Sequence, residues 1–174
     1  MSNNKAQEVF VPLDIAVVTV SDTRTEETDS SGRYLQEALT EAGHRLAEKH
    51  ICKDDVYRLR ALVANLIADH AIHAVILTGG TGFTRRDNTL AAISPLFDST
   101  IDGFGELFRA LSYQEIGSST IQSRAFAGIS NDTAIFCVPG STGACRTAWE
   151  GIIAEQLNSQ HKPCNFVGRI KSES

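Results

Sequence analysis

The sequence predicts an α/β fold: a three-layer α/β/α sandwich with a mostly parallel, Rossmann-like central sheet and one hairpin or antiparallel edge. The runs DIAVVTVS (14–21) and AVILT (74–78) are apolar and β-branched, as in strands buried on both faces of a parallel sheet. Amphipathic helical patterns alternate with these strand patterns. The resulting β-α-β-α-β order requires crossover connections between parallel strands.

The first predicted helix follows a polar, turn-rich segment. Asp29, Ser30 and Ser31 are candidate N-cap residues, and apolar side chains then recur at helical spacing as far as Ala42. Gly43 is suited to end this helix as a C-cap. A weaker strand, HRLAEKHI (44–51), follows.

The second predicted helix opens at the segment KDD (53–55) and carries an apolar stripe as far as Ile67. Asp54 and Asp55 suit the positive end of its dipole, which is the more conservative explanation of both residues. The third strand, AVILT, comes next and leads directly into a glycine-rich loop.

The second half of the chain alternates short helices with one hairpin. We expect a helix over 88–97 that Pro95 disturbs, a second over 104–111 and a loop over 117–120. The segment FAGIS-ND-TAIFCV (126–138) predicts a hairpin with a tight Asn-Asp turn, and its second strand is apolar enough to be central. A last amphipathic helix contains Trp149, and no clear element follows Gln160.

The length of 174 residues fits one domain with a substantial core. We predict a flexible segment over 1–12, a single domain over 13–166 and a polar tail over 167–174. The net charge of −5 argues against a general nucleic-acid binder, since such proteins carry a basic face. It leaves room for a small anionic ligand held by local donors.

Cysteine usage and the lack of targeting signals favour a cytoplasmic protein. The four cysteines are widely spaced with no CxxC pair, which fits a reducing compartment and argues against a zinc site. We find no signal-peptide pattern and no apolar run of membrane-spanning length, so we expect no membrane association.

Three of the predicted strands end in loops with chemically useful residues: Ser21-Asp22, Thr78 to Asp87, and Pro139 to Thr142. Ligands of open parallel sheets bind outside the carboxyl ends of the strands. These loops should therefore meet on one rim, and their convergence is stronger evidence for a site than any one of them alone.

The loop TGGTGFTRRD (78–87) could hold a phosphate. Without a Cβ at Gly79, Gly80 and Gly82, the main chain can approach an anion closely and line it with N–H groups. Thr81 adds a hydroxyl, and Asp87 could hold Mg²⁺ or orient a nucleophile. The sequence is neither a Walker A loop nor GxGxxG, so a plain glycine-rich turn is the alternative.

The other candidates also have plain structural explanations. Asp22 is either a metal ligand or a turn former. Arg85 and Arg86 either neutralise phosphates or form a solvated surface pair. Ser141, after Pro-Gly, either donates to an anion or caps the last helix, and the two roles are compatible.

Several longer segments resemble the MogA/MoaB family of molybdenum cofactor biosynthesis proteins, whose domain also occurs in gephyrin and MoeA. TGGTGFTRRD and PGST carry the likeness, and VTVSDTR, DSSGRYLQEALTEAGH, GFGELFRALSYQEIGSSTIQSRAFAG, PGSTGACRTAWEGIIAEQL and KPCNF are similar to the MoaB branch. The resemblance covers roughly residues 14–166 and is specific.

The resemblance implies a function. Family members bind molybdopterin, a pterin with a dithiolene and a terminal phosphate, and the activity implied is adenylyl transfer from Mg-ATP to that phosphate. The expected enzyme is thus a molybdopterin adenylyltransferase, with Mg²⁺ as cofactor and ATP and molybdopterin as substrates. The family also implies a homotrimer or homohexamer and a separate partner protein that inserts molybdate.

Site residues are carried over from the family position by position. Asp54 and Asp87 are implied as the catalytic, Mg²⁺-holding carboxylates. The implied ligand-binding residues are Ser21, Asp22, Thr78, Gly79, Gly80, Thr81, Gly82, Ser118, Ser119, Pro139, Gly140 and Ser141. Ser21 and Asp22 are assigned to the nucleotide side, and Pro139 to Ser141 to the pterin side.

Two alternatives stay open. The same pocket could belong to a non-catalytic protein that stores or delivers molybdopterin. An unrelated dinucleotide-binding oxidoreductase is the other alternative, and the missing GxGxxG after the first strand argues against it.

Overall fold

A six-stranded sheet in the order β2-β1-β3-β6-β5-β4 runs through the part of the chain that the computed structural model describes, residues 9–171. The first four strands in this order are parallel, and β5 and β4 complete the sheet as an antiparallel edge. The strands are β1 (Asp14–Val20), β2 (Arg45–Cys52), β3 (Ala74–Thr78), β4 (Ser99–Thr100), β5 (Phe126–Ser130) and β6 (Thr133–Val138). The predicted α/β sandwich with one antiparallel edge is confirmed.

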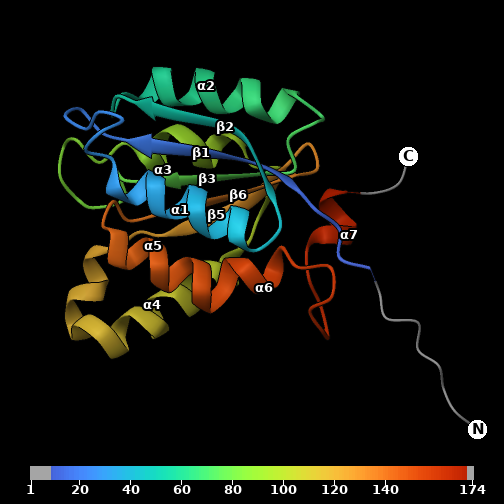
Figure 1. The fold of residues 1–174 in the computed structure, drawn as a ribbon. Helices are drawn as coiled ribbons and strands as arrows, with labels where there is room; N and C mark the ends of the chain where they lie inside the picture. The colour runs from blue at the N-terminus through green and yellow to red at the C-terminus, as the bar shows by residue number, and fades with distance from the viewer. Residues whose placement is uncertain (1–8, 172–174) are drawn as a thin grey trace, which may run out of the picture.

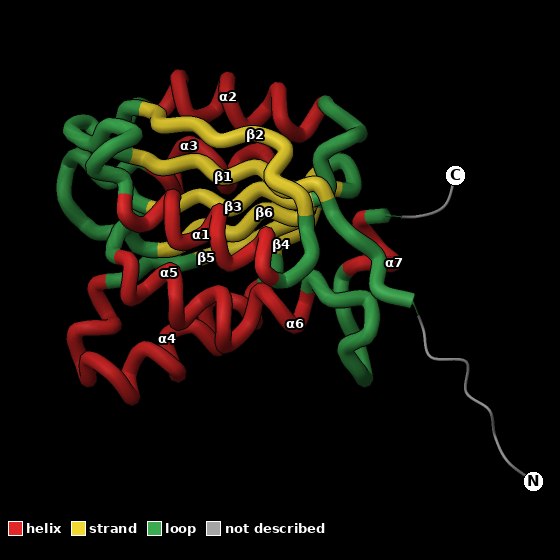
Figure 2. Tube along the Cα trace, in the orientation of Figure 1, coloured by secondary structure: helices red, strands yellow, loops and turns green. Residues whose placement is uncertain are grey.

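Helices cover both faces of this sheet (Figure 1). One face packs against α1 (Ser30–Glu41), α4 (Asp102–Ile116), α5 (Thr142–Ala148) and the π-helical turn η3 (Trp149–Ile153), which α6 (Ala154–Gln156) continues. The other face packs against α2 (Val56–Ala68) and α3 (Thr89–Ile93). Two separate apolar clusters, one on each face, form the core. Figure 2 shows the same three layers, with the strands between the two sets of helices.

The pattern of side chains explains the central position of β3. All five residues of β3 are buried, because it lies between β1 and β6 with helices on both faces. Residues Asn131 and Asp132 join β5 to β6 with φ values of 48° and 64°. Positive φ at both central residues is typical of a type I′ hairpin turn, and the predicted hairpin is confirmed.

Several elements differ from the predicted bounds. The helix predicted over 104–111 extends over the whole of α4, and the loop predicted over 117–120 is a 3₁₀ helix, η2 (Gly117–Gln122). The disturbed helix over 88–97 is α3 followed by a 3₁₀ turn, η1 (Ser94–Leu96), with Pro95 in its first positions. The two-residue strand β4 was not predicted, since a segment that short carries no periodicity.

The predicted absence of any element after Gln160 is wrong. A short helix, α7 (Val167–Ile170), packs Val167 and Ile170 into the apolar cluster shared with α1 and α5. It lies at the amino end of the parallel strands, opposite the glycine loop (Figure 1). The predicted flexible segment 1–12 falls mostly on residues 1–8, which lie outside the described residues.

Within the described residues, no helix combines the length and the apolar character needed to cross a membrane.

Candidate functional site

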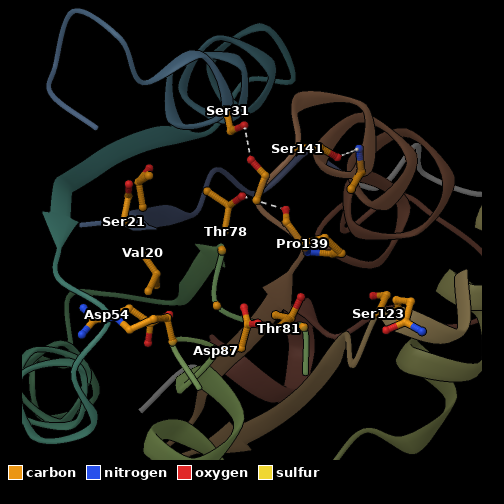
Figure 3. A pocket seen from close by; sticks show the side chains of 18 of the residues that line it. Val20, Ser21, Ser31, Asp54, Thr78, Thr81, Asp87, Ser123, Pro139 and Ser141 are labelled. Carbon is orange, nitrogen blue, oxygen red and sulfur yellow. Dashed lines mark hydrogen bonds between the residues drawn. The ribbon is translucent and has the colours of Figure 1, made fainter. Parts of the chain in front are cut away.

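A cavity of about 530 Å³ lies at the carboxyl ends of β1, β3 and β6 (Figure 3). All three loops singled out in the sequence contribute to its wall, so the predicted convergence on one rim is confirmed. The implied site residues that line the cavity are Ser21, Asp22, Asp54, Thr78, Gly79, Gly80, Thr81, Gly82, Asp87, Ser119, Pro139, Gly140 and Ser141.

The glycine loop needs glycine at its first two positions. Gly79 and Gly80 have φ values of +109° and +67°. A Cβ on Gly79 would lie 2.3 Å from the Val20 carbonyl oxygen, and a Cβ on Gly80 would lie 2.3 Å from Thr89 Oγ1. No larger residue fits either position without moving the backbone of β1 or the start of α3.

The loop is anchored at its ends and open in its middle. The Gly79 N–H donates to the Val138 carbonyl at 2.9 Å, and Thr89 holds the carbonyls of Gly79 and Gly80 through its hydroxyl (2.8 Å) and its N–H (3.0 Å). Within residues 9–171, the N–H groups of Gly80 and Thr81 donate no hydrogen bond. Such unpaired main-chain donors beside a cavity can bind an anion.

Asp54 lies under this loop and is largely buried. Its Oδ1 accepts the Asn88 N–H at 3.0 Å, while its Oδ2 lies 2.9 Å from the place where a Cβ on Gly80 would be. Burial raises the pKa of the Asp54 carboxyl; the Asn88 hydrogen bonds oppose the rise, and the nearby charges of Asp87 and Asp22 add to it. A cation at Oδ2 would relieve this like-charge repulsion.

Asp87 closes the loop on itself. Its Oδ2 accepts both the N–H (2.8 Å) and the hydroxyl (2.7 Å) of Thr84. Burial pushes the pKa of the Asp87 carboxyl up, but hydrogen bonds from Thr84 and from the Gly82 N–H, with the charge of Arg124, leave it below its usual range. Asp87 is therefore an ionised carboxylate that also fixes the shape of the loop.

Asp22 and Arg86 form an ion pair across the cavity mouth, from the loop after β1 to the glycine loop. The hydrogen bond from Arg86 is the largest cause that lowers the pKa of Asp22. Of the two arginines Arg85 and Arg86, Arg86 lines the cavity. The Asp22 carboxylate also accepts the Asp54 N–H at 3.2 Å, so Asp22 links the loop after β1 to the segment before α2.

The carboxylates do not form a ready-made metal cage. Among the described residues, no group of three or more His, Cys, Asp or Glu side chains has the geometry to hold a metal ion. Mg²⁺ typically needs only one or two carboxylates when substrate phosphates and water supply its other ligands. Asp54, with Oδ2 directed at the open part of the loop, fits that mode of binding.

The loop after β6 is held by hydroxyl groups. Thr78 Oγ1 donates to the Pro139 carbonyl at 2.9 Å, and Ser31 Oγ donates to the Gly140 carbonyl at 2.9 Å (Figure 3). Ser141 caps α5, because its Oγ accepts the Ala144 N–H at 3.1 Å. The predicted capping by Ser141 is confirmed, and the Thr78 hydroxyl is directed at the neighbouring loop.

The structure distinguishes the members of two pairs of neighbouring candidate residues. Ser118 does not line the cavity, whereas Ser119 does, because the 3₁₀ turn η2 directs successive side chains to different sides. At the start of α2, Asp55 is the N-cap and accepts the N–H groups of Tyr57 (3.0 Å) and Arg58 (2.9 Å), whereas Asp54 faces Asn88.

Sequence reasoning missed part of the wall. Residues that line the cavity without having been named as site residues include Thr19, Arg24, Asp29, Ser31, Phe108, Ser112, Ile116, Gln122 and Ser123. Asp29 was identified only as a candidate cap, and it does accept the Gly32 N–H at 2.9 Å. The available signal was topological: a helix that follows β1 begins at the same rim, so the first turn of α1 had to lie there.

Comparisons with known proteins agree with this geometry. Residues 16–159 match the family model MoCF_biosynth, described as "Probable molybdopterin binding domain". The chain is similar to "Molybdenum cofactor biosynthesis protein B" of Escherichia coli (strain K12), with 52% identity over 162 residues that cover 93% of this chain and 95% of the relative. The protein of the same name in Bacillus subtilis (strain 168) is 49% identical over 142 residues, which cover 81% of this chain and 84% of that one.

A solved structure has the same fold. The crystal structure of "Molybdenum cofactor biosynthesis protein B" matches with a TM-score of 0.83 and 44% identity, over 86% of this chain and 94% of the other. The family match spans most of the chain, including the rim cavity and every strand except the first two residues of β1. The chain therefore belongs to the molybdopterin-binding domain family.

Proposed function

We propose that this protein acts in molybdenum cofactor biosynthesis: it binds molybdopterin in the rim cavity and transfers AMP to it from Mg-ATP. A terminal phosphate oxygen of molybdopterin attacks the α-phosphorus of ATP and forms a new P–O bond. The bond between the α-phosphorus and its bridging oxygen to the β-phosphate breaks, and pyrophosphate leaves. Since the attacking phosphate is already ionised, the reaction needs no general base.

One observation carries this proposal. The unpaired N–H groups of Gly80 and Thr81 lie beside the open oxygen of Asp54, at the edge of the sheet where ligands of such folds bind. Donors and a carboxylate side by side are the two features needed to hold phosphate oxygens together with their cation.

The expected chemistry is mainly electrostatic. Both substrates are anionic and repel each other, so the site has to offset negative charge as they approach. The loop N–H groups would bind phosphate oxygens, and Arg86 would add a positive charge at the mouth. Mg²⁺ held by Asp54 and Asp87 would neutralise the polyphosphate.

A non-catalytic molybdopterin carrier remains the second candidate. The ion pair of Asp22 with Arg86 favours it, because this carboxylate is then already neutralised. The oxidoreductase alternative has lost its support, because the chain belongs to a different family and the loop after β1 has no dinucleotide motif.

Pyrophosphate release separates enzyme from carrier. Purified protein is mixed with molybdopterin and Mg-ATP, and binding and release are measured separately for the wild type, Asp87→Asn and Asp55→Asn. We expect Asp87→Asn to keep molybdopterin binding and lose release. Asp55→Asn should resemble the wild type, because asparagine also caps helices well and Asp55 lies outside the cavity wall. Binding without release in the wild type would identify a carrier.

A further inference from the structure

Arg124 ties the glycine loop to the segment between η2 and β5. Its main-chain N–H donates to the Thr81 carbonyl at 3.0 Å. Its Nη2 donates to the carbonyls of Gly82 and, at 3.2 Å, Asp87. One residue thus holds three carbonyl groups of a loop that lies 37 to 43 positions earlier in the chain.

The guanidinium group is enclosed by the same loop. Its central carbon lies over the Phe83 ring, 4.7 Å from the ring centroid, and Phe83 itself is 64% exposed. Among the described residues, Nε of Arg124 is buried and has no hydrogen-bond partner. A buried donor without a hydrogen-bond partner costs free energy, so the position of Arg124 calls for an explanation other than its own stability.

The contacts of Arg124 fix the direction of the loop peptides. In a trans peptide the C=O and the following N–H point to opposite sides. Because the Thr81 carbonyl faces Arg124, the Gly82 N–H faces the other way, toward the Asp87 carboxylate that it stabilises. Arg124 and Asp87 therefore hold the same peptide from two sides.

We propose that Arg124 is a positioning residue: it fixes the Thr81–Gly82 peptide and the main chain of Asp87 beside the open N–H groups of Gly80 and Thr81, which Thr89 orients, in the arrangement that receives the substrate phosphates. This inference rests on the proposed function. Arg124 itself is not among the residues that line the cavity and acts through the loop. The flat guanidinium group suits this task, since its Nη2 donates to two carbonyls while its plane lies over the Phe83 ring, and lysine has no plane to stack on a ring.

The test compares Arg124→Gln and Arg124→Lys with Arg109→Gln. Arg109 is a matched control, because it is also partly buried and its Nη1 donates at 3.0 Å to the Ala125 carbonyl, next to Arg124 but not to the glycine loop. Hydrogen exchange of the ligand-free proteins is followed in the peptide covering 79–89. The kcat for pyrophosphate release, per folded molecule, and the KM for Mg-ATP are then measured.

We expect faster exchange of the loop amides, by about tenfold or more, and a kcat about 100-fold lower in Arg124→Gln, since misplacing a reacting group by about 1 Å costs that much. The KM for Mg-ATP should change little. The exchange rate and kcat of Arg124→Lys should lie between those of the wild type and Arg124→Gln. Arg109→Gln should match the wild type in both measurements. A purely structural role would lower the folded fraction and leave kcat per folded molecule unchanged, which would overturn the proposal.

Two further results separate failure of this inference from failure of the proposed function. If the wild type releases no pyrophosphate, the proposed activity fails, and Arg124 is then judged by loop exchange and by the Kd for molybdopterin. Unchanged exchange and Kd in Arg124→Gln would overturn its positioning role. If Arg124→Gln does not fold, Phe83→Leu removes only the ring, and it should loosen the same amides to a smaller extent.

Discussion

The main-chain N–H of Asn88 donates to the Asp54 carboxylate at 3.0 Å, and the Asn88 side-chain amide donates to the Asp54 main-chain carbonyl at 3.2 Å. These two hydrogen bonds from Asn88 join the segment before α2 to the start of α3. It fixes one oxygen of Asp54 and leaves the other directed at the glycine loop. Asn88, which follows the glycine loop in the sequence, therefore sets the position of the Asp54 carboxylate.

Asp54→Asn should retain the fold and lose activity. The raised pKa of Asp54 means that the folded protein disfavours the ionised carboxyl, so above its usual pKa the charge lowers the free energy of unfolding. A neutral asparagine can still accept the Asn88 N–H, and we expect stability within about 1 kcal/mol of the wild type, or higher. Pyrophosphate release should fall about 100-fold or more. Urea unfolding and turnover are measured on the same sample, and retained turnover would remove Asp54 from the proposed site.

Gly80→Ala should disrupt the loop. The new Cβ would lie 2.3 Å from Thr89 Oγ1 and 2.9 Å from Asp54 Oδ2, at a φ of +67°. Strain of this kind costs about 1–3 kcal/mol, and the displaced N–H should also weaken molybdopterin binding. Gly103→Ala is the control, because a Cβ on Gly103, which lies in α4, meets nothing within 4 Å. It should stabilise the protein by up to about 1 kcal/mol, and equal behaviour of the two variants would contradict the explanation.

Two histidines, His44 buried and His73 partly buried, should make stability depend on pH. His44 Nδ1 accepts the Leu13 N–H at 3.2 Å, and His73 Nδ1 accepts the Asp14 N–H at 2.9 Å, so both rings must be neutral at that nitrogen. Burial is the main cause that lowers the pKa of each histidine. The unfolded chain then binds more protons than the folded one, and stability should fall as the pH drops below about 6.5.

The measurement is urea unfolding between pH 7.5 and pH 5, for the wild type and His44→Asn. The asparagine oxygen can replace Nδ1 as an acceptor but does not titrate in this range. The variant should be less stable at pH 7.5, because its side chain is smaller, and its stability should depend less on pH. An unchanged slope would show that His44 does not contribute. Asp14 has a lowered pKa and affects stability only in the separate window below about 3.8.

Breaking the ion pair at the cavity mouth should change ligand binding more than stability. Arg86 and Asp22 are both solvent-exposed, and screening makes such pairs weak contributors to stability. Arg86→Gln should raise the Kd for Mg-ATP several-fold and make it less sensitive to salt. Arg85→Gln is the neighbouring control, since Arg85 does not line the cavity. Calorimetric titration at low and high salt tests this, and equal effects of the two variants would indicate only general charge attraction.

The sequence predicts those features of the fold and the site that depend on local patterns. The continuous apolar run of β3 and the alternation of strands and helices were enough to bring the three loops to one rim. Contacts between distant residues were not predictable in this way. Ser31 reaches Gly140 across 109 positions, and Arg124 reaches Asp87 across 37, and no local period marks either pair. Ser118 and Ser119 were separated by the turn of a 3₁₀ helix that the sequence did not signal.

Residues 167–170, expected from the sequence to belong to a polar tail, form α7 and contribute to the core. Residues 167–171 contain only two large apolar side chains, those of Val167 and Ile170. Their spacing of three positions places both on one face of α7, where they are 5% and 4% exposed. Ile170→Ala should lower the free energy of unfolding by about 2 kcal/mol, the low end for a buried isoleucine, because a terminal helix can shift to fill space. Arg169→Gln, which removes an exposed ion pair with Asp132, should change it by less than about 0.5 kcal/mol. Both variants should keep molybdopterin binding, since α7 lies at the opposite end of the sheet from the cavity (Figure 1). If Ile170→Ala is as stable as Arg169→Gln, α7 does not contribute to the core in solution.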